Sequence, residues 1–301
     1  MVARSAQSGR TAQGTAGEST PRTETTRLLL IDCPDEVGLV HRITGVLFRA
    51  GFSVVSNHEY VDPTRRHFFM RTAFAGEGPT DAIVVGLRSE LSAAATIRVA
   101  TTEPRRIVIF ATKEPHCLGD LLIRHVEDDI PAHVEAVISN YATLGRLVDR
   151  FDVPFHHVGH EGLDRAEHEA RIRDVLAQYD PEFLVLAKYM RVLSPAFVAS
   201  YPARIINIHH SFLPAFVGAR PYQQAFDRGV KIIGATAHIV TDDLDTGPII
   251  AQDVRPVTHA HTAADMARAG RDVEKIVLAH GLTLLLEERV FLSGDRAVVF
   301  E

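Results

Sequence analysis

Two polar side chains occupy alternate positions of the apolar segment IINIHHSFLPAF, which runs from Ile205 to Phe216. Residues two apart in a strand point to the same face, so Asn207 and His209 would both face one pocket. An amide donor and an imidazole can stabilise an oxyanion and move protons at a carbonyl centre. Asp245, in LDTGPII, would add a carboxylate to this set. The spacing alone also fits a buried polar strand end whose groups are satisfied by loop amides.

A series of short apolar strands, separated by longer amphipathic segments, leads up to these residues. We expect the strands at Ile107 to Ala111, His133 to Ser139, Phe155 to Val158, Phe183 to Leu186 and Ile205 to His209. This alternation predicts an α/β domain with a mostly parallel sheet, helices on both faces, and ligands at the carboxyl ends of the strands. Asn207 and His209 would lie at such an end.

The pattern changes after this segment. KIIGATAHIV and PIIAQDVRPV predict paired strands, and a long helix is expected from about Thr262 to Glu288. The terminal RVFLSGDRAVVF resembles a small hairpin.

The first hundred residues predict a separate domain. Residues 1–24 are rich in Ser, Thr, Gly, Ala and Gln without apolar periodicity, which is typical of a disordered tail. Residues 25–102 give strands and helices in the order βαββαβ, which predicts a small ferredoxin-like domain with two helices on one face of a four-stranded antiparallel sheet. A linker at Glu103, Pro104 and Arg105 then opens the second domain, residues 103–301.

Composition excludes several classes of protein. The chain has 301 residues, 46% of them hydrophobic and 23% charged, which is enough for a large core and more than one domain. A net charge of -6 without a Lys/Arg block argues against a nucleic-acid partner. No apolar run approaches the roughly 20 residues that span a bilayer, so we expect no membrane partner and a cytoplasmic location. Cys33 and Cys117 would be structural thiols in a reducing compartment.

At the residues of the opening segment, the chain resembles the folate-dependent formyltransferase fold family. That family carries an Asn, a His two positions later, an SxLP motif and an Asp before GPII. The matching residues here are Asn207, His209, Ser211 with Leu213 and Pro214, and Asp245 before Gly247 to Ile250. The resemblance runs through NIHHSFLPAFVGARPYQQAF and GVKIIGATAHIVTDDLDTGPIIAQ, and it covers roughly residues 26 to 301. It implies an N-terminal ACT domain followed by a Rossmann-like formyltransferase domain.

The resemblance implies 10-formyltetrahydrofolate as substrate and no permanently bound cofactor. Asn207 and His209 would donate to the formyl oxygen, and His209 would also supply a proton toward N10 of the folate. Asp245 would hold the imidazole or orient a water molecule. The implied folate pocket lies between Tyr189 to Leu193 and Val240 to Leu244. The expected substrate-binding residues are Met190, Arg191, Val192, Leu193, His210, Val240, Thr241, Leu244 and Gly247. Without the resemblance, the segment YMRVL fits a plain helix start or a strand exit, and the segment TDDLD fits an acidic, solvated turn.

The acceptor of the formyl group is the remaining question. Three segments most resemble the members of the family that hydrolyse 10-formyltetrahydrofolate to formate and tetrahydrofolate. They are the double histidine at His209 and His210, the run FLPAF and the preceding LAKYMRVLSPAFV. In the first βα turn, TKEPHCLGDLL, Glu114 is anionic and Pro115 has no amide hydrogen, so the turn is poorly suited to cradle a phosphate. Lys113, His116 and a helix dipole would still attract an anion.

Hydrolysis is therefore expected, supplying formate for purine synthesis and balancing the one-carbon folate pools. The alternative is a formyltransferase to an amine such as glycinamide ribonucleotide. A third reading is a regulatory protein whose second domain binds folate without turnover.

Other clusters offer weaker chemistry. His156, His157 and His160, or His259 and His261, have no recognised metal-ligand spacing, so we expect no metal. Cys117, near an expected helix N-terminus, would suit a thiol nucleophile, but a small packed residue is the preferred interpretation.

The segment CPDEVGLV resembles the ACT signature, in which the glycine lets the backbone approach an amino-acid effector. Asp35 and Gly38 match it, with Asn57 as a partner on the second strand. The alternative is a plain strand-to-helix turn in which Asp35 caps the helix and Gly38 relaxes the backbone. Because ACT domains commonly bind effectors where two copies pair, the resemblance also implies a homo-oligomer, a dimer or a tetramer.

Overall fold

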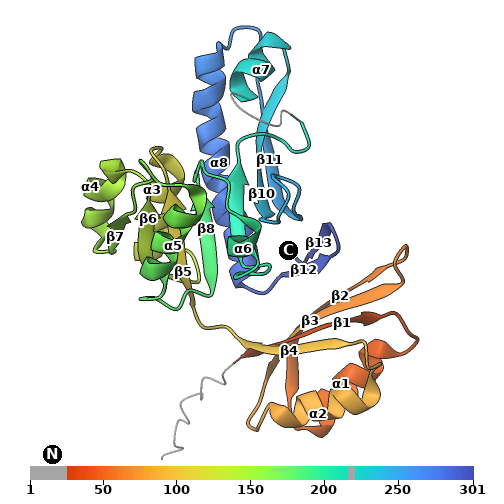
Figure 1. Ribbon diagram of the computed structural model, residues 1–301. Coiled ribbons are helices and arrows are strands. Elements are labelled where there is room, and N and C mark those ends of the chain that lie inside the picture. Colours follow the sequence, from red (N-terminus) through yellow and green to blue (C-terminus); the bar gives the residue numbers. More distant parts are fainter. Residues whose placement is uncertain (1–25, 216–220) are drawn as a thin grey trace, which may run out of the picture.

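The computed structural model describes residues 26–215 and 221–301, which fold into two α/β domains (Figure 1). The expected disordered tail, residues 1–24, lies outside the described residues. So do residues 216–220, which belong to the family-like motif.

The first domain has the expected βαββαβ order. Its strands are β1 (Arg27–Pro34), β2 (Ser53–Asp62), β3 (His67–Ala75) and β4 (Thr96–Thr101), and they form an antiparallel sheet in the order β2-β3-β1-β4. Helices α1 (Leu39–Arg49) and α2 (Asp81–Glu90) cover one face of this sheet (Figure 1). The core between sheet and helices contains Leu29, Ile31, Ile43, Leu47, Phe74, Ile83 and Leu87, all buried.

The opposite face of the same sheet is covered by the C-terminal hairpin, β12 (Val290–Ser293) and β13 (Arg296–Val299) (Figure 1). Leu28, Leu30 and Phe69 pack there against Phe291, and the rings of Phe69 and Phe291 lie 5.7 Å apart. This second cover explains why β1 is apolar at successive positions, since a strand buried on both faces has no solvent side. The hairpin follows the second domain in sequence but packs on the first.

The second domain is built on a seven-stranded sheet in the order β11-β10-β9-β8-β5-β6-β7. Its parallel part consists of β5 (Arg105–Ala111), β6 (Ala132–Ser139), β7 (Phe155–His157), β8 (Phe183–Ala187) and β9 (Ile205–His209). The strands β10 (Ile232–Ile239) and β11 (Ile249–Pro256) extend it in antiparallel fashion. The strands expected from the sequence and the mostly parallel sheet are confirmed.

Helices cover both faces of this sheet. On one face pack α3 (His116–Val126), α4 (Gly145–Val148) and the 24-residue α8 (Ala263–Leu286). On the other pack α5 (Arg165–Leu176) and α6 (Pro195–Val198). Short 3-10 turns at Ala142–Leu144 and Asp149–Phe151 and helix α7 (Pro221–Asp227) complete the domain.

The order of the strands fixes where a ligand is expected. The chain builds from β5 outward through β6 and β7, and then returns to place β8 and β9 on the other side of β5. In doubly wound sheets, the crevice at the carboxyl ends of the strands where this reversal occurs is the usual binding site. The turns after β5, β8 and β9 border this crevice.

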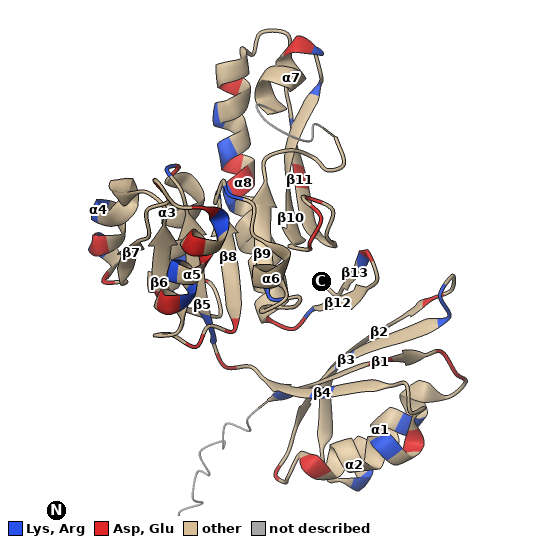
Figure 2. Cartoon of the chain, in the orientation of Figure 1, with Lys and Arg blue, Asp and Glu red and all other residues tan. Residues whose placement is uncertain are grey.

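Charges of both signs lie along α2 and α8, whereas Arg42 and Arg49 are the charged residues of α1 (Figure 2). Within the described ranges, no helix has the length and apolar character needed to cross a membrane.

Candidate active site

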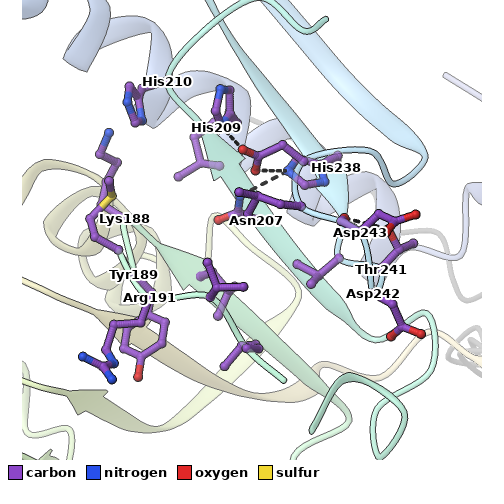
Figure 3. A pocket seen from close by; sticks show the side chains of 18 residues that line it. Lys188, Tyr189, Arg191, Asn207, His209, His210, His238, Thr241, Asp242 and Asp243 are labelled. Atoms are coloured by element: carbon purple, nitrogen blue, oxygen red, sulfur yellow. Dashed lines mark hydrogen bonds and ion pairs between the residues drawn. The ribbon is translucent and has the colours of Figure 1, made fainter. Parts of the chain in front are cut away.

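A cavity of about 350 Å³ lies at the carboxyl ends of β8 and β9 (Figure 3). This volume is typical of small-molecule sites. The cavity is bordered by the segment after β8, the end of β9 and the loop between β10 and β11. Its lining residues are Leu186, Lys188 to Leu193, Asn207 to His210, His238 and Val240 to Asp245.

The three expected catalytic residues meet in this cavity. The Nδ1 atom of His209 lies 3.1 Å from Oδ2 of Asp245, and Asn207 faces the same space from the adjacent inward position of β9. The Nε2 atom of His209 is buried and has no hydrogen-bond partner among the described residues. An imidazole held at one nitrogen and unpaired at the other is arranged to exchange a proton with a bound molecule.

Asp245 owes its position to an unusual backbone conformation. Its φ of +56° is in the left-handed region, which Asp tolerates better than most residues. Burial opposes ionisation of this carboxyl, but hydrogen bonding to the His209 imidazole overcomes that effect and holds its pKa well below the usual range. Asp245 is therefore a carboxylate at neutral pH and favours a hydrogen on Nδ1 of His209.

His238 is a fourth member of the site that the sequence analysis missed. It stands opposite Asn207 in the antiparallel pairing of β9 and β10. Its Nδ1 lies 2.9 Å from the carbonyl oxygen of Ile239, which must accept, so Nε2 is free to accept from Nδ2 of Asn207 at 3.1 Å. One Asn207 amide hydrogen is thus engaged, and the second remains for a ligand. Only the strand register, which the sequence pattern did not give, would have identified His238.

The segment that follows β8 is held from two sides. The backbone N–H of Met190 donates to Oγ1 of Thr112 at 3.0 Å, and that of Ser194 donates to the buried Glu169 carboxylate at 2.7 Å. Between these anchors, Met190 and Val192 are half exposed, as is Leu244 on the facing loop. Apolar side chains left open at the mouth of a cavity form a suitable surface for a flat ring.

Nearly all of the expected substrate-binding residues line the cavity. They are Met190, Arg191, Val192, Leu193, His210, Val240, Thr241 and Leu244, with Tyr189 beside them. Gly247 does not line it. Gly247 is buried, and a Cβ there would lie 1.9 Å from the carbonyl oxygen of Ile239, so its place in the structure is explained by close backbone packing.

The side chains considered for other chemistry have different roles. Cys117 is fully buried, and burial raises its pKa well above the usual range, which disfavours a thiolate nucleophile. Burial likewise raises the pKa of Cys33 to about 11. His156 lies 2.7 Å from the Tyr179 hydroxyl. Within the described part of the chain, metal-ligand types gather at His116, Cys117 and Glu274, none of them in the histidine groups named above.

The expected effector residues do not meet within one chain. Gly38 has a φ of +83° and starts α1 without any side-chain cap, so Asp35 does not cap this helix. Asn57 accepts from Thr72 and donates to Glu59, both at 2.5 Å. It lies five residues along the sheet from the Pro34 end of β1, roughly 17 Å.

Fold and site together define a two-domain protein with a formyl-transfer type of catalytic domain. The formyl transferase family model matches residues 105–282, and the ACT domain model matches residues 27–84. The chain therefore belongs to the formyl transferase family and carries an ACT domain ahead of the family's own domain.

Relatives that match over almost the whole chain are formyltetrahydrofolate deformylases. The chain is 51% identical to the one from Escherichia coli, with 91% of this chain and 98% of the relative covered. It is 40% identical to the one from Bacillus subtilis, with 90% and 93% covered.

Solved structures give the same grouping. The structure of a formyltetrahydrofolate deformylase from Pseudomonas syringae pv. tomato has a TM-score of 0.88 and 38% identity, covering 93% of this chain and 96% of that one. A glycinamide ribonucleotide transformylase from Symbiobacterium toebii has a TM-score of 0.64 and 30% identity, covering 70% of this chain and all of that one.

Proposed function

We propose that this protein hydrolyses 10-formyltetrahydrofolate to formate and tetrahydrofolate, with water as the acceptor. The observation that carries the proposal is the buried, unpaired Nε2 of His209, which stands beside Asn207 and the ionised Asp245 in a cavity. The names of the relatives that match over nearly the whole chain support the same reaction.

The geometry suggests a sequence of steps at the formyl carbon. The free amide hydrogen of Asn207 and a protonated Nε2 of His209 donate to the formyl oxygen and stabilise the negative charge that develops there. Asp245 keeps the Nδ1 hydrogen of His209 directed at itself, so Nε2 faces the substrate. Water adds its oxygen to the formyl carbon, and the bond from that carbon to N10 breaks. Of the two water protons, one replaces the proton that His209 gives to N10, and the other is released as the product ionises to formate.

The folate ring would occupy the apolar end of the cavity. Met190 and Val192 on one side and Leu244 on the other present half-exposed apolar groups, and the backbone between Tyr189 and Leu193 offers donors and acceptors for the ring edge. Arg191 is placed to pair with an anionic part of the substrate.

The first βα turn favours water over a phosphorylated amine. His116 points inward and lies 2.7 Å from the buried Glu274 carboxylate. The Lys113 ammonium lies 4.1 Å from the centre of the Tyr141 ring. Both side chains that would attract a phosphate thus have other partners, although Lys113 keeps solvent contact. The similarity to the transformylase favours the second candidate, a formyltransferase to an amine, through the shared catalytic domain.

Formate release from 10-formyltetrahydrofolate without any added acceptor tests the proposal. We expect steady formate production by the wild type, and a loss of about 10²-fold or more in kcat for Asn207→Ala, His209→Ala and Asp245→Ala with little change in stability. A protein that consumes the substrate only when an amine is present would be a transferase. Tight folate binding with no turnover would instead identify a regulatory folate binder.

We extend the proposal to the ACT domain, which would bind a small amino acid that changes activity. Since Asn57 lies far from Gly38 within one chain, a shared site requires a second copy. The edge strand β2 supports pairing of copies, because it carries the exposed apolar side chains Val54, Val55, Tyr60 and Val61. Sedimentation measurements should give a dimer or tetramer, and calorimetry against amino acids should give heat for one class. A monomer without heat for any amino acid would contradict this extension.

The proposed setting is cytoplasmic one-carbon metabolism. Water is an acceptor that is always present, so the reaction would discard an activated one-carbon unit unless it were controlled. Control of this kind is consistent with release of formate for purine synthesis and with balancing of the folate pools.

A further inference from the structure

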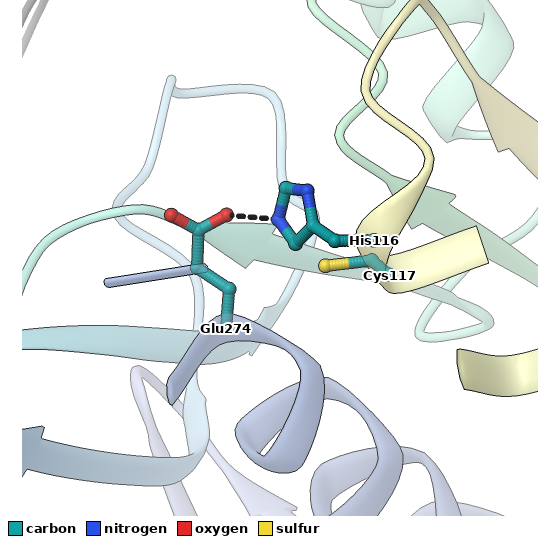
Figure 4. Close-up of side chains that lie close together, drawn as sticks. All are labelled: His116, Cys117 and Glu274. Carbon is teal, nitrogen blue, oxygen red and sulfur yellow. Dashed lines mark hydrogen bonds and ion pairs between the residues drawn. The ribbon is translucent and has the colours of Figure 1, made fainter. Parts of the chain in front are cut away.

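The carboxylate of Glu274, near the middle of α8, is the centre of a buried cluster behind the active site, and Figure 4 shows its contact with His116. Oε2 of Glu274 lies 2.7 Å from Nε2 of His116 and 3.1 Å from Nζ of Lys188. The hydroxyl of Tyr222 donates to Oε1 at 2.6 Å. The side chains of Glu274 and Lys188 are 1% and 4% exposed. We call these four residues the Glu274 cluster.

The cluster fills the place where this class of sheet ordinarily binds a ligand. His116 is the first residue of α3, directly after the turn that follows β5, and Lys188 is the first residue after β8. These two strands flank the reversal in the strand order, where the crevice for a ligand lies. Tyr222 on α7 and Glu274 on α8 close the crevice from the side of the helices.

Stability alone does not account for this cluster. A buried ion pair is seldom better for stability than apolar residues of similar volume, because both charges lose their water. Lys188 also adopts a φ of +62°, a strained backbone conformation for a residue with a long side chain. Gly270, one turn before Glu274, leaves the space that the Tyr222 hydroxyl occupies, since a Cβ there would lie 2.0 Å from that oxygen. A costly arrangement of this kind indicates a function.

The cluster lies directly behind one end of the active-site cavity. Lys188 and His210 line the cavity at this end, whereas Tyr189 and Arg191 lie at the other (Figure 3). The ring of His210 stacks on that of His209 at 5.1 Å and lies 6.3 Å from the ring of Tyr222. Burial, and then the nearby Lys188 ammonium, lower the pKa of His210 to about 4, so its imidazole is neutral at physiological pH.

We propose that the Glu274 cluster, acting through His210, is an acceptor-selecting wall that admits water to the formyl carbon and excludes larger amines. The inference rests on the proposed hydrolysis and adds the residues that determine its acceptor. The folate takes the end of the cavity at Tyr189 and Arg191, so a nucleophile must come from the end that the wall closes. The neutral His210 presents a ring nitrogen there that can hold a water molecule without adding charge.

Removing part of the wall should let an amine compete with water. In that reaction the amine nitrogen adds to the formyl carbon and loses a proton, the bond to N10 breaks, and N10 gains a proton. The products are then a formamide and tetrahydrofolate. The ratio of formamide to formate measures how often an amine, rather than water, accepts the formyl group. Both products come from the same folded molecules, so the ratio does not depend on how much of a variant is folded.

The test adds hydroxylamine or glycinamide to the 10-formyltetrahydrofolate assay of the full-length protein. We expect the wild type to give formate with almost no N-formylglycinamide. Tyr222→Ala and His116→Gly, which shorten two parts of the wall, should raise the ratio of formamide to formate at least 10-fold, hydroxylamine more than glycinamide. Tyr222→Phe keeps the ring and should leave the ratio as in the wild type. Met190→Ala, which widens the opposite end, should change KM without changing the ratio.

An unchanged ratio in both shortened variants, at measurable turnover, would overturn the inference. So would efficient formyl transfer to glycinamide by the wild type. If both variants lose turnover, ligand-observed NMR can measure the binding of glycinamide instead. Binding to the variants but not to the wild type would support the wall. Absence of binding to all three proteins would contradict it. Failure of the wild type to release formate without an amine would contradict the proposed function instead.

Discussion

The His209 ring is fixed at one nitrogen and unpaired at the other: Nδ1 lies 3.1 Å from Oδ2 of Asp245, while the buried Nε2 has no partner among the described residues. Asn207, on the same face of β9, supplies a second group that can donate to a substrate oxygen. The two donors make this a site for a developing oxyanion, and Asp245 determines which hydrogen the imidazole presents.

Asp245→Asn should lower kcat by about 10²- to 10⁴-fold, because a neutral amide holds the Nδ1 hydrogen of His209 less firmly than a carboxylate does. KM should change little, since the folate would contact the backbone and apolar groups elsewhere in the cavity. Steady-state kinetics check this expectation. A kcat within a few-fold of the wild type would remove Asp245 from the proton chemistry.

His238→Ala should lower kcat about 10-fold with little effect on KM, because Asn207 would lose the ring nitrogen that orients its amide. His238 is a positioning residue in this account, so His238→Gln, whose amide oxygen can accept from Asn207, should restore part of the loss. Equal kcat values for the Ala and Gln variants would argue that His238 only fills space.

The stability of the protein should fall as the pH is lowered from 7 to 5, in part through His210. Its pKa is about 4 in the folded protein against an ordinary value of 6.5, so the unfolded state binds more protons between these values. Protonation therefore favours unfolding, and His210 should contribute a loss on the order of 1–2 kcal/mol by pH 5. Glu274, with a pKa lowered to about 2, adds to the loss below pH 4.5.

Urea unfolding of the wild type and of His210→Gln at pH 7 and pH 5 measures this contribution. The two proteins differ only at position 210, so the difference between their pH slopes reports the loss of the His210 imidazole. Parallel slopes would contradict a neutral buried imidazole at this position.

Glu288→Gln should loosen the contact between the two domains. The carboxylate of Glu288 accepts from Arg98 of β4 at 2.5 Å and from Arg105 at the start of β5 at 2.9 Å. Arg71 of β3 also donates to the backbone oxygen of Glu288 at 3.1 Å. Loss of the charge removes the carboxylate that Arg98 contacts and one of the two that Arg105 contacts, since Arg105 keeps Glu182, and should cost about 1–3 kcal/mol.

Differential scanning calorimetry checks this prediction, and faster proteolysis at residues 102–104, which join β4 to β5, should accompany the change. Glu287→Gln serves as the control. The carboxylate of Glu287 is partly exposed and pairs with the neighbouring Arg289, not with Arg98 or Arg105. Identical melting of the two variants would contradict a special role for Glu288.

The sequence predicted the elements and part of the site because these depend on local patterns. The two-residue period of a strand predicted that Asn207 and His209 share one face. The alternation of strands and helices predicted that both lie at the carboxyl end of a strand in a parallel sheet. Asp245 entered through a motif, because its approach to His209 depends on a left-handed backbone conformation that spacing does not reveal.

Long-range contacts were not predicted, for identifiable reasons. His238 meets Asn207 through strand register, and Glu274 meets Lys188 across 86 residues, from a helix whose polar residues otherwise face solvent. The packing of Phe291 on Leu28 and Leu30 likewise depends on the tertiary arrangement of a hairpin whose own pattern is only apolar alternation.

Hydrolysis in ¹⁸O-labelled water shows whether water is the acceptor of the formyl group. Mass spectrometry of the formate made from 10-formyltetrahydrofolate without an added amine should show one solvent oxygen per formate. Tetrahydrofolate should form in equal amount. Both products should be lost in His209→Ala. Substrate consumed only in the presence of an amine, or formate made equally fast by His209→Ala, would contradict the account.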